Sequence, residues 1–348
     1  MTRWDEFDGD EMNIHVPQSI QTVCELRLIA NANQRLVKPA TSSIAIVPKQ
    51  DAIMGVYVLT KPGVKLDSKD VTNITMSTSI GMNHSIPKGV LVDGKYVFSQ
   101  IVPPGINLTK ENDKNETVFE IRNGVLIKGI VDKSIITTIL QKTWFQYGSV
   151  ETQNFIDDLQ RMILQFLLIH GYTISIKDAI MDQKVYDDVY KIIETKRKEV
   201  LTIITEFEND PSTMDRESLE IIIVNILQSI QSDAEKVVMP NFTSDNGIYN
   251  CIESKSAGLR FNAVQIICCI GQVILDGKMI QKKFNNRTLP CFFQYDDSPA
   301  ARGFCHNSFM KGLNPHEFFF HVMSGREGVI SSAIKTADKP HNLLLGRL

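Results

Sequence analysis

The sequence predicts a helix-rich α+β fold, and three observations support this prediction. Two long stretches with helical apolar spacing, Gln183 to Glu208 and Arg216 to Val238, follow each other in the second half of the chain. Two strand–turn–strand patterns centre on Asp93-Gly94 and Asn123-Gly124 in the first half. A last helical stretch begins near Gly312. Small β-hairpins among helices indicate α+β rather than an all-helical bundle.

Composition and charge narrow the class of protein. The chain has 348 residues, of which 43% are hydrophobic and 22% charged, which is ordinary for a globular protein of two or three domains. Its net charge of −3 disfavours a stand-alone nucleic-acid clamp, because such proteins neutralise phosphates with an excess of basic residues. Any contact with nucleic acid is therefore expected to be local or shared with basic partners.

Cysteine usage and apolar runs favour a reduced, intracellular and non-secreted protein. None of the 6 cysteines forms a Cys-x-x-Cys pair, so a zinc ribbon is not expected. Cys268 and Cys269 lie in an apolar, helix-like run and are expected in the core. No signal peptide is recognised at Met1, and the longest apolar stretch, Met162 to Ile169, is too short to cross a membrane.

The first elements are expected to be helices. Gln18 to Leu36 has helical spacing, with Pro17 suited to the first helical position. Gln50 to Thr60 is predicted as a second helix that ends before Pro62-Gly63, and Asp67 to Thr78 as a third.

The apolar period then changes to that of strands. Asp93-Gly94 and Asn123-Gly124 are dipeptides typical of two-residue hairpin turns. Each separates two short apolar runs, which we predict as the paired strands of two hairpins: residues 90–92 with 96–98, and 117–121 with 125–130. The polar stretch Lys110 to Glu116 is predicted to be the loop between the hairpins.

Helices are predicted again from Ile135 onward. Asn154 to Ile169 is strongly apolar and is expected to be buried, with His170 as a cap residue before the helix-ending Gly171. The two long stretches that follow are joined by the polar residues 209–212 and predict an antiparallel helical hairpin. The basic run Lys196-Arg197-Lys198 on the first of them is expected to be a solvated face.

Two later helices show capping signals. Asn262 is predicted as an N-cap, with Gln265 three positions further on. Asn314, Pro315 and Glu317 suit the N-cap, first and third positions of the helix that runs to Ala337. Gly325 and Gly328 fall inside this helix, where each costs ~1 kcal/mol relative to alanine, so we expect either a bend or a close approach to its backbone. Asp338-Lys339-Pro340 is predicted to end it.

An acidic cluster near Met1 is the sharpest chemical signal in the chain. Glu6, Asp8 and Asp10 alternate with other residues around Gly9, and three carboxylates so close repel one another by ~1 kcal/mol per pair in water. Solvent exposure relieves that repulsion in an ordinary surface loop. A hard divalent cation such as Mg²⁺ relieves it in a metal site. An EF-hand is excluded, because loop positions six and twelve hold Glu11 and Pro17.

The residues around this cluster resemble one family. Glu6-Phe7-Asp8-Gly9-Asp10-Glu11-Met12-Asn13, followed by Val16-Pro17-Gln18, is similar to the metal-binding signature of the largest subunit of multisubunit DNA-directed RNA polymerases. The stretch Gly312 to Gly328 resembles the bridge helix of that family, and further matching segments follow in the same order between them. The resemblance implies a pore-like α+β region, a funnel made by the helical hairpin, and a long bridge-type helix.

The resemblance also implies a site. It identifies Asp8 and Asp10 as catalytic metal ligands, with Glu6 as the third ligand where the family has aspartate, and Mg²⁺ as the cofactor. Trp4 replaces a family asparagine that lies near the ribose of the incoming nucleotide.

The resemblance also places a second group of residues near substrate or template. The stretch Gly258 to Gln265 is similar to a family segment that follows a basic residue close to the substrate phosphates, but that position is Ala257 here. Lys255, Gln265 and Arg326 are the residues that we expect near substrate or template. The phosphate-contact and capping interpretations of Asn262 and Gln265 are compatible, and both stay open.

The family comparison suggests four parts and a viral source. We expect the end of the metal loop at 1–16, a pore-like domain at 17–175, a funnel-like helical domain at 176–304, and the start of a cleft domain at 305–348 with about two-thirds of a bridge helix. The upstream clamp and the downstream mobile loop of the family are not recognised in this sequence. We therefore expect a split or truncated homologue, as in large DNA viruses, located in the nucleus or cytoplasm of the host cell or in the virion.

The expected function is template-directed synthesis of RNA from ribonucleoside triphosphates. In this reaction the RNA 3′-hydroxyl attacks the triphosphate, with one Mg²⁺ held by the carboxylates and another accompanying the nucleotide. The expected partners are the second-largest subunit, the remaining segments of the largest subunit, DNA, RNA and nucleoside triphosphates, with no membrane, and the isolated chain is expected to be inactive. The alternative is a non-catalytic, degenerate fragment that binds polymerase subunits or nucleic acid. An independent Mg²⁺ phosphohydrolase has support only from the acidic cluster.

Overall fold

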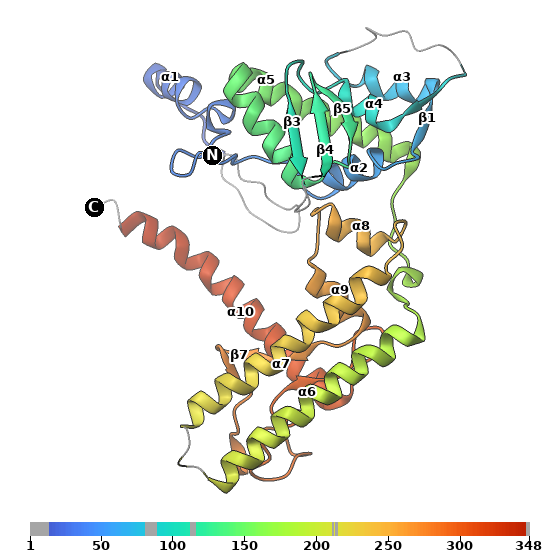
Figure 1. Ribbon diagram of the computed structural model, residues 1–348. Coiled ribbons are helices and arrows are strands. Elements are labelled where there is room, and N and C mark those ends of the chain that lie inside the picture. The colour runs from blue at the N-terminus through green and yellow to red at the C-terminus, as the bar shows by residue number, and fades with distance from the viewer. Residues whose placement is uncertain (1–13, 81–88, 112–115, 211, 213–214, 346–348) are drawn as a thin grey trace. The chain divides into compact units, whose positions relative to one another are not determined.

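The computed structural model describes residues 14–80, 89–111, 116–210, 212 and 215–345, with side chains described up to residue 331 (Figure 1). Contacts divide the chain into two compact units. The first unit comprises Met1–Thr173 with Asn250–Ala257, and the second comprises Ile174–Tyr249 with Gly258–Leu348. The helix-rich α+β fold is confirmed, whereas the finer division into four parts stays a prediction.

The first unit is built around a long helix that packs against a short helix buried along almost its whole length. The central helix α5 (Lys133–His170) changes direction at Gly148, whose φ is 86°. Helix α2 (Asp51–Leu59) contacts α5 and buries every residue from Ala52 to Leu59. The other helices of this unit are α1 (Ile20–Leu28), α3 (Ser68–Met76), α4 (Gly94–Ser99), the short 3₁₀ turn Ala32–Arg35, and α8 (Gly247–Glu253), which crosses the boundary.

Two small antiparallel sheets complete the first unit. Strands β1 (Lys65–Asp67) and β2 (Leu91–Asp93) form one pair. Strands β3 (Leu108–Glu111), β4 (Thr117–Arg122) and β5 (Val125–Lys128) form the other sheet in that order, beside α4 (Figure 1). Phe119, Ile121 and Leu126 turn inward from it and join the core of α2 and α5.

Two of the predictions for the β-region differ from the structure. Asp93-Gly94 is not a hairpin turn, because residues 94–99 form α4 and β2 pairs with β1. The Asp93 carboxylate caps α4 by accepting from the Lys95 N–H at 2.8 Å. A Cβ on Gly94 would lie 2.1 Å from the Leu59 carbonyl oxygen, so the glycine serves close packing. The predicted loop Lys110 to Glu116 is wrong at its start, since residues 110–111 belong to β3.

The other hairpin is confirmed. Asn123 and Gly124, with φ of 48° and 78°, join β4 to β5 in the left-handed conformation that this type of turn requires. The helices at 50–60 and 67–78 are also confirmed, the latter with Asp67 as its N-cap. The first predicted helix is shorter than expected: α1 is capped by Ser19, whose hydroxyl accepts from the Thr22 N–H, so Pro17 precedes the helix.

The second unit contains the predicted antiparallel helical pair. Helices α6 (Gln183–Asn209) and α7 (Arg216–Val238) lie side by side, as Figure 1 shows, and pack through apolar residues at helical spacing. Val189, Ile193 and Val200 are buried on α6, and Ile223 and Leu227 are buried on α7.

In the first unit, the predicted helix end at His170-Gly171 is confirmed, with Gly171 as the C-cap of α5 at φ 70°.

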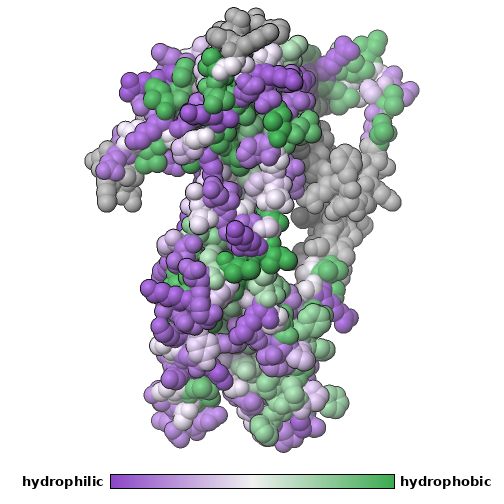
Figure 2. Space-filling model, turned by 90° about the vertical axis from the view of Figure 1, so that its right-hand side faces the viewer, coloured by the Kyte–Doolittle hydropathy of each residue, from purple (hydrophilic) through white to green (hydrophobic). Residues whose placement is uncertain are grey.

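The rest of the second unit consists of short strands and two further helices. Strand β6 (Gly271–Gln272) pairs with β9 (Phe304–Cys305), and β7 (Ile274–Leu275) pairs with β8 (Lys278–Met279). The helices are α9 (Arg260–Ile267) and α10 (Pro315–Leu345), with 3₁₀ turns at Ile176–Ala179, Met239–Asn241 and Phe284–Asn286. Hydrophilic residues are spread over the face drawn in Figure 2, in keeping with 22% charged residues.

Two helix boundaries in this unit correct the sequence predictions. Helix α9 begins after Leu259, so Asn262 stands at its third position, where its side chain accepts from the Leu259 N–H at 2.7 Å. Helix α10 does not end at Asp338-Lys339-Pro340 but continues to Leu345. Proline removes one backbone hydrogen bond and costs about 3 kcal/mol inside a helix, which weakens a helix without having to end it.

Candidate functional site

The predicted metal ligands Glu6, Asp8 and Asp10 lie outside the described residues. Their assignment therefore stays a prediction. Among the residues that the structure describes, no group of three or more histidine, cysteine or acidic side chains could hold a metal ion. The Mg²⁺ assignment rests on the N-terminal carboxylates and on the resemblance of this segment to the metal-binding signature of the family.

Lys255, expected near substrate, is held at the start of a helix in the first unit. Its ammonium donates to the Asp132 carboxylate at 2.7 Å and to the Ser134 hydroxyl at 3.1 Å. Asp132 also caps α5 by accepting from the Ile135 N–H at 2.8 Å. Burial alone would raise the pKa of Asp132, but the hydrogen bonds from Lys255, Ser134 and Ile135 outweigh it and lower the pKa. Lys255 therefore has a structural role at the start of α5.

Gln265 and Arg326, the other two residues expected near substrate or template, fall in the second unit. Gln265 is half-buried on α9, where its backbone carbonyl accepts from the Phe309 N–H at 3.3 Å. Arg326 is exposed on α10. That these residues and Lys255 contact substrate or template stays a prediction.

The start of α10 is fixed by a buried carboxylate. Glu317 is 2% exposed, and its two oxygens accept four hydrogen bonds. Oε1 accepts from the N–H groups of His306 at 2.7 Å and Asn307 at 3.2 Å. Oε2 accepts from the Asn307 side-chain amide at 2.7 Å and the Asn314 N–H at 2.9 Å. The bond to Asn314 is the cap that the sequence predicts, whereas the bonds to residues 306–307 had no signal in the sequence.

These four bonds change the ionisation of the site. Burial alone would raise the pKa of Glu317, but the hydrogen bonds from Asn314, Asn307 and His306 outweigh it and lower the pKa. The neighbouring thiol responds in the opposite direction, because burial and the Glu317 charge raise the pKa of Cys305 to about 12. The carboxylate is therefore ionised and the thiol neutral at pH 7. The contacts of Glu317 with His306, Asn307 and Asn314, together called the Glu317 joint, fix the base of α10.

The first turns of α10 present both a buried and an exposed apolar side. Phe320 is fully buried and stacks on Phe292, with ring centroids 6.2 Å apart. Phe318, Phe319 and Val322 are exposed. Gly325 and Gly328 follow, and none of the described residues lies within 4 Å of a Cβ built on either glycine. This part of the helix therefore offers apolar side chains and bare backbone for contact.

A cluster of ion pairs around Arg302 forms a second joint in the same unit. Arg302 is 4% exposed and binds Glu220 of α7 through one guanidinium nitrogen and Asp297 through another, the latter at 3.3 Å. Asp297 also accepts from Lys282 at 2.7 Å and from Arg216 of α7 at 3.1 Å. This cluster ties the loop before β9 to the start of α7.

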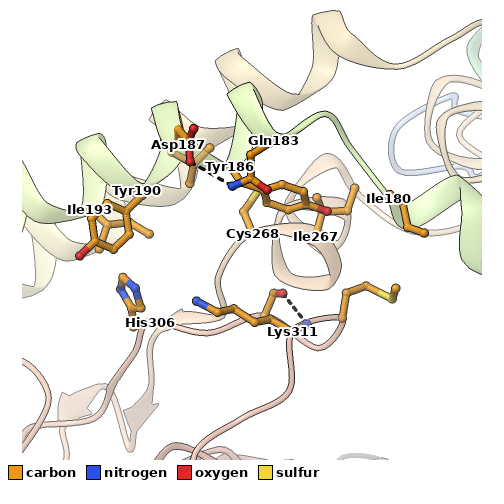
Figure 3. Close-up of a pocket in the computed structure, with 13 residues that line it drawn as sticks. Ile180, Gln183, Tyr186, Asp187, Tyr190, Ile193, Ile267, Cys268, His306 and Lys311 are labelled. Atoms are coloured by element: carbon orange, nitrogen blue, oxygen red, sulfur yellow. Dashed lines mark hydrogen bonds between the residues drawn. The ribbon is translucent and has the colours of Figure 1, made fainter.

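The second unit also contains a cavity of about 460 Å³ between α6 and residues 306–311 (Figure 3). The half-buried ring of His306 meets Tyr190 edge-on at its wall, with centroids 5.5 Å apart. The His306 ring is thus packed against a neighbouring aromatic ring. Burial lowers the pKa of His306, and the nearby Lys311 charge lowers it further.

Within the described residues, no helix is both long and apolar enough to cross a bilayer.

Comparison with known proteins defines the class. Models of three consecutive domains of the RNA polymerase subunit Rpb1 match this chain in order: domain 3 over residues 35–179, domain 4 over 203–305, and domain 5 over 312–340. The molecule is thus built from consecutive domains of a multisubunit polymerase.

Individual relatives agree with the domain matches. The chain is 55% identical over 333 residues to DNA-directed RNA polymerase subunit 1 of Acanthamoeba polyphaga mimivirus, covering 96% of this chain and 22% of that protein. It is 32% identical over 353 residues to the RNA polymerase II subunits RPB1-A and RPB1-B of Trypanosoma brucei brucei, covering 96% of this chain and 20% of each. The chain belongs to the family of the largest subunits of DNA-directed RNA polymerases, and it spans about a fifth of the length of these curated relatives.

Proposed function

We propose that this chain contributes the central part of the largest subunit to a DNA-directed RNA polymerase, which copies DNA into RNA from ribonucleoside triphosphates. The observation that supports this most directly is the 55% identity to mimivirus RNA polymerase subunit 1 over 96% of the chain. The proposed partners are the second-largest subunit, the other segments of the largest subunit, DNA, RNA and nucleoside triphosphates. The isolated chain would be inactive, and its compartment would be inside the host cell or the virion.

The proposed cofactor is Mg²⁺ held by Asp8 and Asp10, with Glu6 as the third ligand. The donor set fits this ion, because Mg²⁺ takes carboxylate oxygens and retains several waters. When bound, the ion supplies Lewis acidity at the reacting phosphate. The three carboxylates would orient it through their spacing around Gly9.

Residues of the second unit would then position the template and the substrate. The Glu317 joint holds the base of α10, so the exposed Phe318, Phe319 and Val322 are presented in a fixed register. Arg326, exposed further along the same helix, would approach the template, and Gln265 the substrate. Lys255 belongs to the first unit and would bring its positive charge near substrate from the start of α5.

The alternative is a non-catalytic fragment that binds polymerase subunits or nucleic acid without turnover. The observations that favour it are Glu6, Trp4 and Ala257, each at a position where the family signature has a different residue. This alternative predicts that the chain assembles with polymerase subunits and that the activity of the complex does not depend on the three carboxylates.

Alanine substitution separates these two functions. In a polymerase assembled with this chain, Asp8→Ala and Asp10→Ala should each reduce nucleotide addition at least about 10³-fold, since metal-centred charge stabilisation is worth several kcal/mol. Lys198→Ala, on the exposed face of α6, is the control and should leave the rate unchanged. Equal rates for the aspartate variants and the control would favour the non-catalytic fragment. The Glu6→Asp variant restores the family ligand and should raise the rate if Glu6 is the weaker donor.

A further inference from the structure

The cavity beside α6 lies within the second unit, and side chains from three segments of the chain line it. Its lining residues come from the first turns of α6, the end of α9 and the segment that follows β9: Ile180, Gln183, Tyr186, Asp187, Val189, Tyr190, Ile193, Ile267, Cys268, His306, Ser308, Met310 and Lys311. A volume of about 460 Å³ is in the range of small-molecule sites, which run from about 300 to 1,000 Å³. None of these residues belongs to the predicted metal loop, whereas His306 also donates its backbone N–H to Glu317 at the base of α10.

Apolar and aromatic groups form one side of this cavity. Val189, Ile193 and Ile267 are buried and form its floor. Two tyrosines of α6 stand at its walls (Figure 3). The Tyr186 hydroxyl accepts from the Met181 N–H at 3.2 Å, and the Tyr190 ring is held edge-on by His306. Rings held in this way offer apolar faces to a ligand at little entropic cost.

Hydrogen-bond donors form the opposite side. In Figure 3 the Lys311 side chain extends along the wall that faces α6, with its ammonium toward His306. Within the described part of the chain, no acceptor pairs with the Lys311 ammonium, and neither ring nitrogen of His306 makes a hydrogen bond. Asp187 lies across the cavity on α6, where its carboxylate already accepts from the Gln183 amide at 3.0 Å. The lysine and histidine wall therefore lacks the acceptor that its donors would bind.

We propose that this cavity binds a small planar aromatic carboxylate. The ring lies against Tyr186, Tyr190 and the aliphatic floor, and the carboxylate accepts hydrogen bonds from the Lys311 ammonium and the His306 ring. The same chemistry is carried by a free aromatic acid and by the C-terminal aromatic residue of a peptide. The proposal does not depend on the proposed polymerase activity, because none of its residues is among those proposed to hold the metal or to approach substrate and template.

The test is a titration of the full chain, carrying isotope-labelled isoleucine and methionine methyl groups, followed by NMR. The probes are indole-3-acetate and its uncharged analogue indole-3-acetamide. Indole-3-acetate should shift the methyl signals of Ile193, Ile267 and Met310 in a saturable way. The amide should bind at least about tenfold more weakly, since a charged hydrogen bond is worth more than one tenfold step in affinity. Acetyl-Gly-Gly-Trp with a free C-terminus, compared with its C-terminal amide, distinguishes a peptide source from a free acid.

Substitutions give the matched control. Lys311→Met keeps the length of the side chain and removes its charge, and should weaken indole-3-acetate binding at least about tenfold while leaving the amide unchanged. Lys198→Met removes a charge from an exposed position of α6 outside the cavity and should change neither. Tyr190→Leu, at a half-exposed position that tolerates change, should weaken both probes. Equal binding of acid and amide, equal effects of the two lysine variants, or the absence of saturable shifts at these methyl groups would overturn the proposal.

Discussion

The two joints of the second unit hold α10 and α7 in place by different means. At the base of α10, one carboxylate is surrounded by four neutral donors and is almost fully buried. At the start of α7, a buried guanidinium is balanced by Glu220 and Asp297, whose side chains are 26% and 29% exposed. Neutral donors stabilise a charge without desolvating a second one, whereas an ion pair must desolvate both. The base of α10 should therefore be the stronger and less salt-dependent joint.

Removing the carboxylate should have the largest effect. Glu317→Ala leaves the donors of His306, Asn307 and Asn314 without their acceptor, at a cost of about 3 kcal/mol or more in the free energy of opening. Hydrogen exchange of peptides covering residues 304–323, followed by mass spectrometry, measures this local free energy. Glu199→Ala, at an exposed position of α6, is the control and should change it by less than about 0.5 kcal/mol. Unchanged protection at 304–323 in the Glu317 variant would show that the packing of Phe320 alone fixes the helix.

The ionic joint should be weaker. Arg302→Met keeps most of the side-chain volume but leaves Glu220 and Asp297 partly unpaired, and should cost about 2 kcal/mol, because their exposure lets water replace part of the lost interaction. Urea titration monitored by hydrogen exchange at the start of α7 measures this cost. The exposed pair Lys278–Glu217 gives the control, since Lys278→Met should cost less than about 0.5 kcal/mol. A larger loss for Arg302 than for Glu317 would reverse the ranking.

Acid should distinguish the two joints through Glu317. The folded-state pKa of Glu317 lies below the usual value of 4.5, so the stabilisation is present above that value and is lost as pH falls through the lowered pKa. Protection of residues 304–323 should therefore decrease between about pH 4.5 and pH 3 by more in the wild type than in Glu317→Gln, which has no carboxylate to titrate. Parallel acid profiles for the two proteins would indicate that another group controls this region.

Salt should produce the smallest difference. At about 1 M salt the Debye length is about 3 Å, so the cost of Arg302→Met should fall to about half of its low-salt value, while that of Glu317→Ala should stay nearly constant. Repeating both hydrogen-exchange experiments at low and high salt gives the comparison. An equal salt dependence of the two costs would contradict the assignment of one joint to neutral donors.

The same contrast explains how much the sequence could predict. The bond from Glu317 to Asn314 spans three positions and follows a capping pattern, so it was predicted from sequence. The pairing of Arg302 with Glu220 spans 82 positions, and no local pattern reports it. The long helices α6 and α7 were predicted nearly to the residue because their apolar periodicity extends over many turns.

Short elements were harder to predict for the same reason. Asn123-Gly124 and Asp93-Gly94 are chemically similar dipeptides, yet only the first is a hairpin turn. The second begins α4, where β2 pairs with β1 and the neighbouring Leu59 backbone leaves no space for a side chain at Gly94. That restriction comes from tertiary packing, which the local sequence does not encode. The candidate site shows the same limit: the cavity lining combines residues 180–193 with 267–268 and 306–311, which no sequence motif connects.

The central claim is that this chain functions as part of a multisubunit RNA polymerase. The most direct test is affinity purification of the tagged chain from cells that express its natural gene, with the copurifying proteins identified by mass spectrometry. The account predicts that a second-largest RNA polymerase subunit copurifies in about equal amount and that the complex extends RNA on a DNA template. Recovery of the chain without that subunit, under conditions in which the chain is folded, would contradict the account.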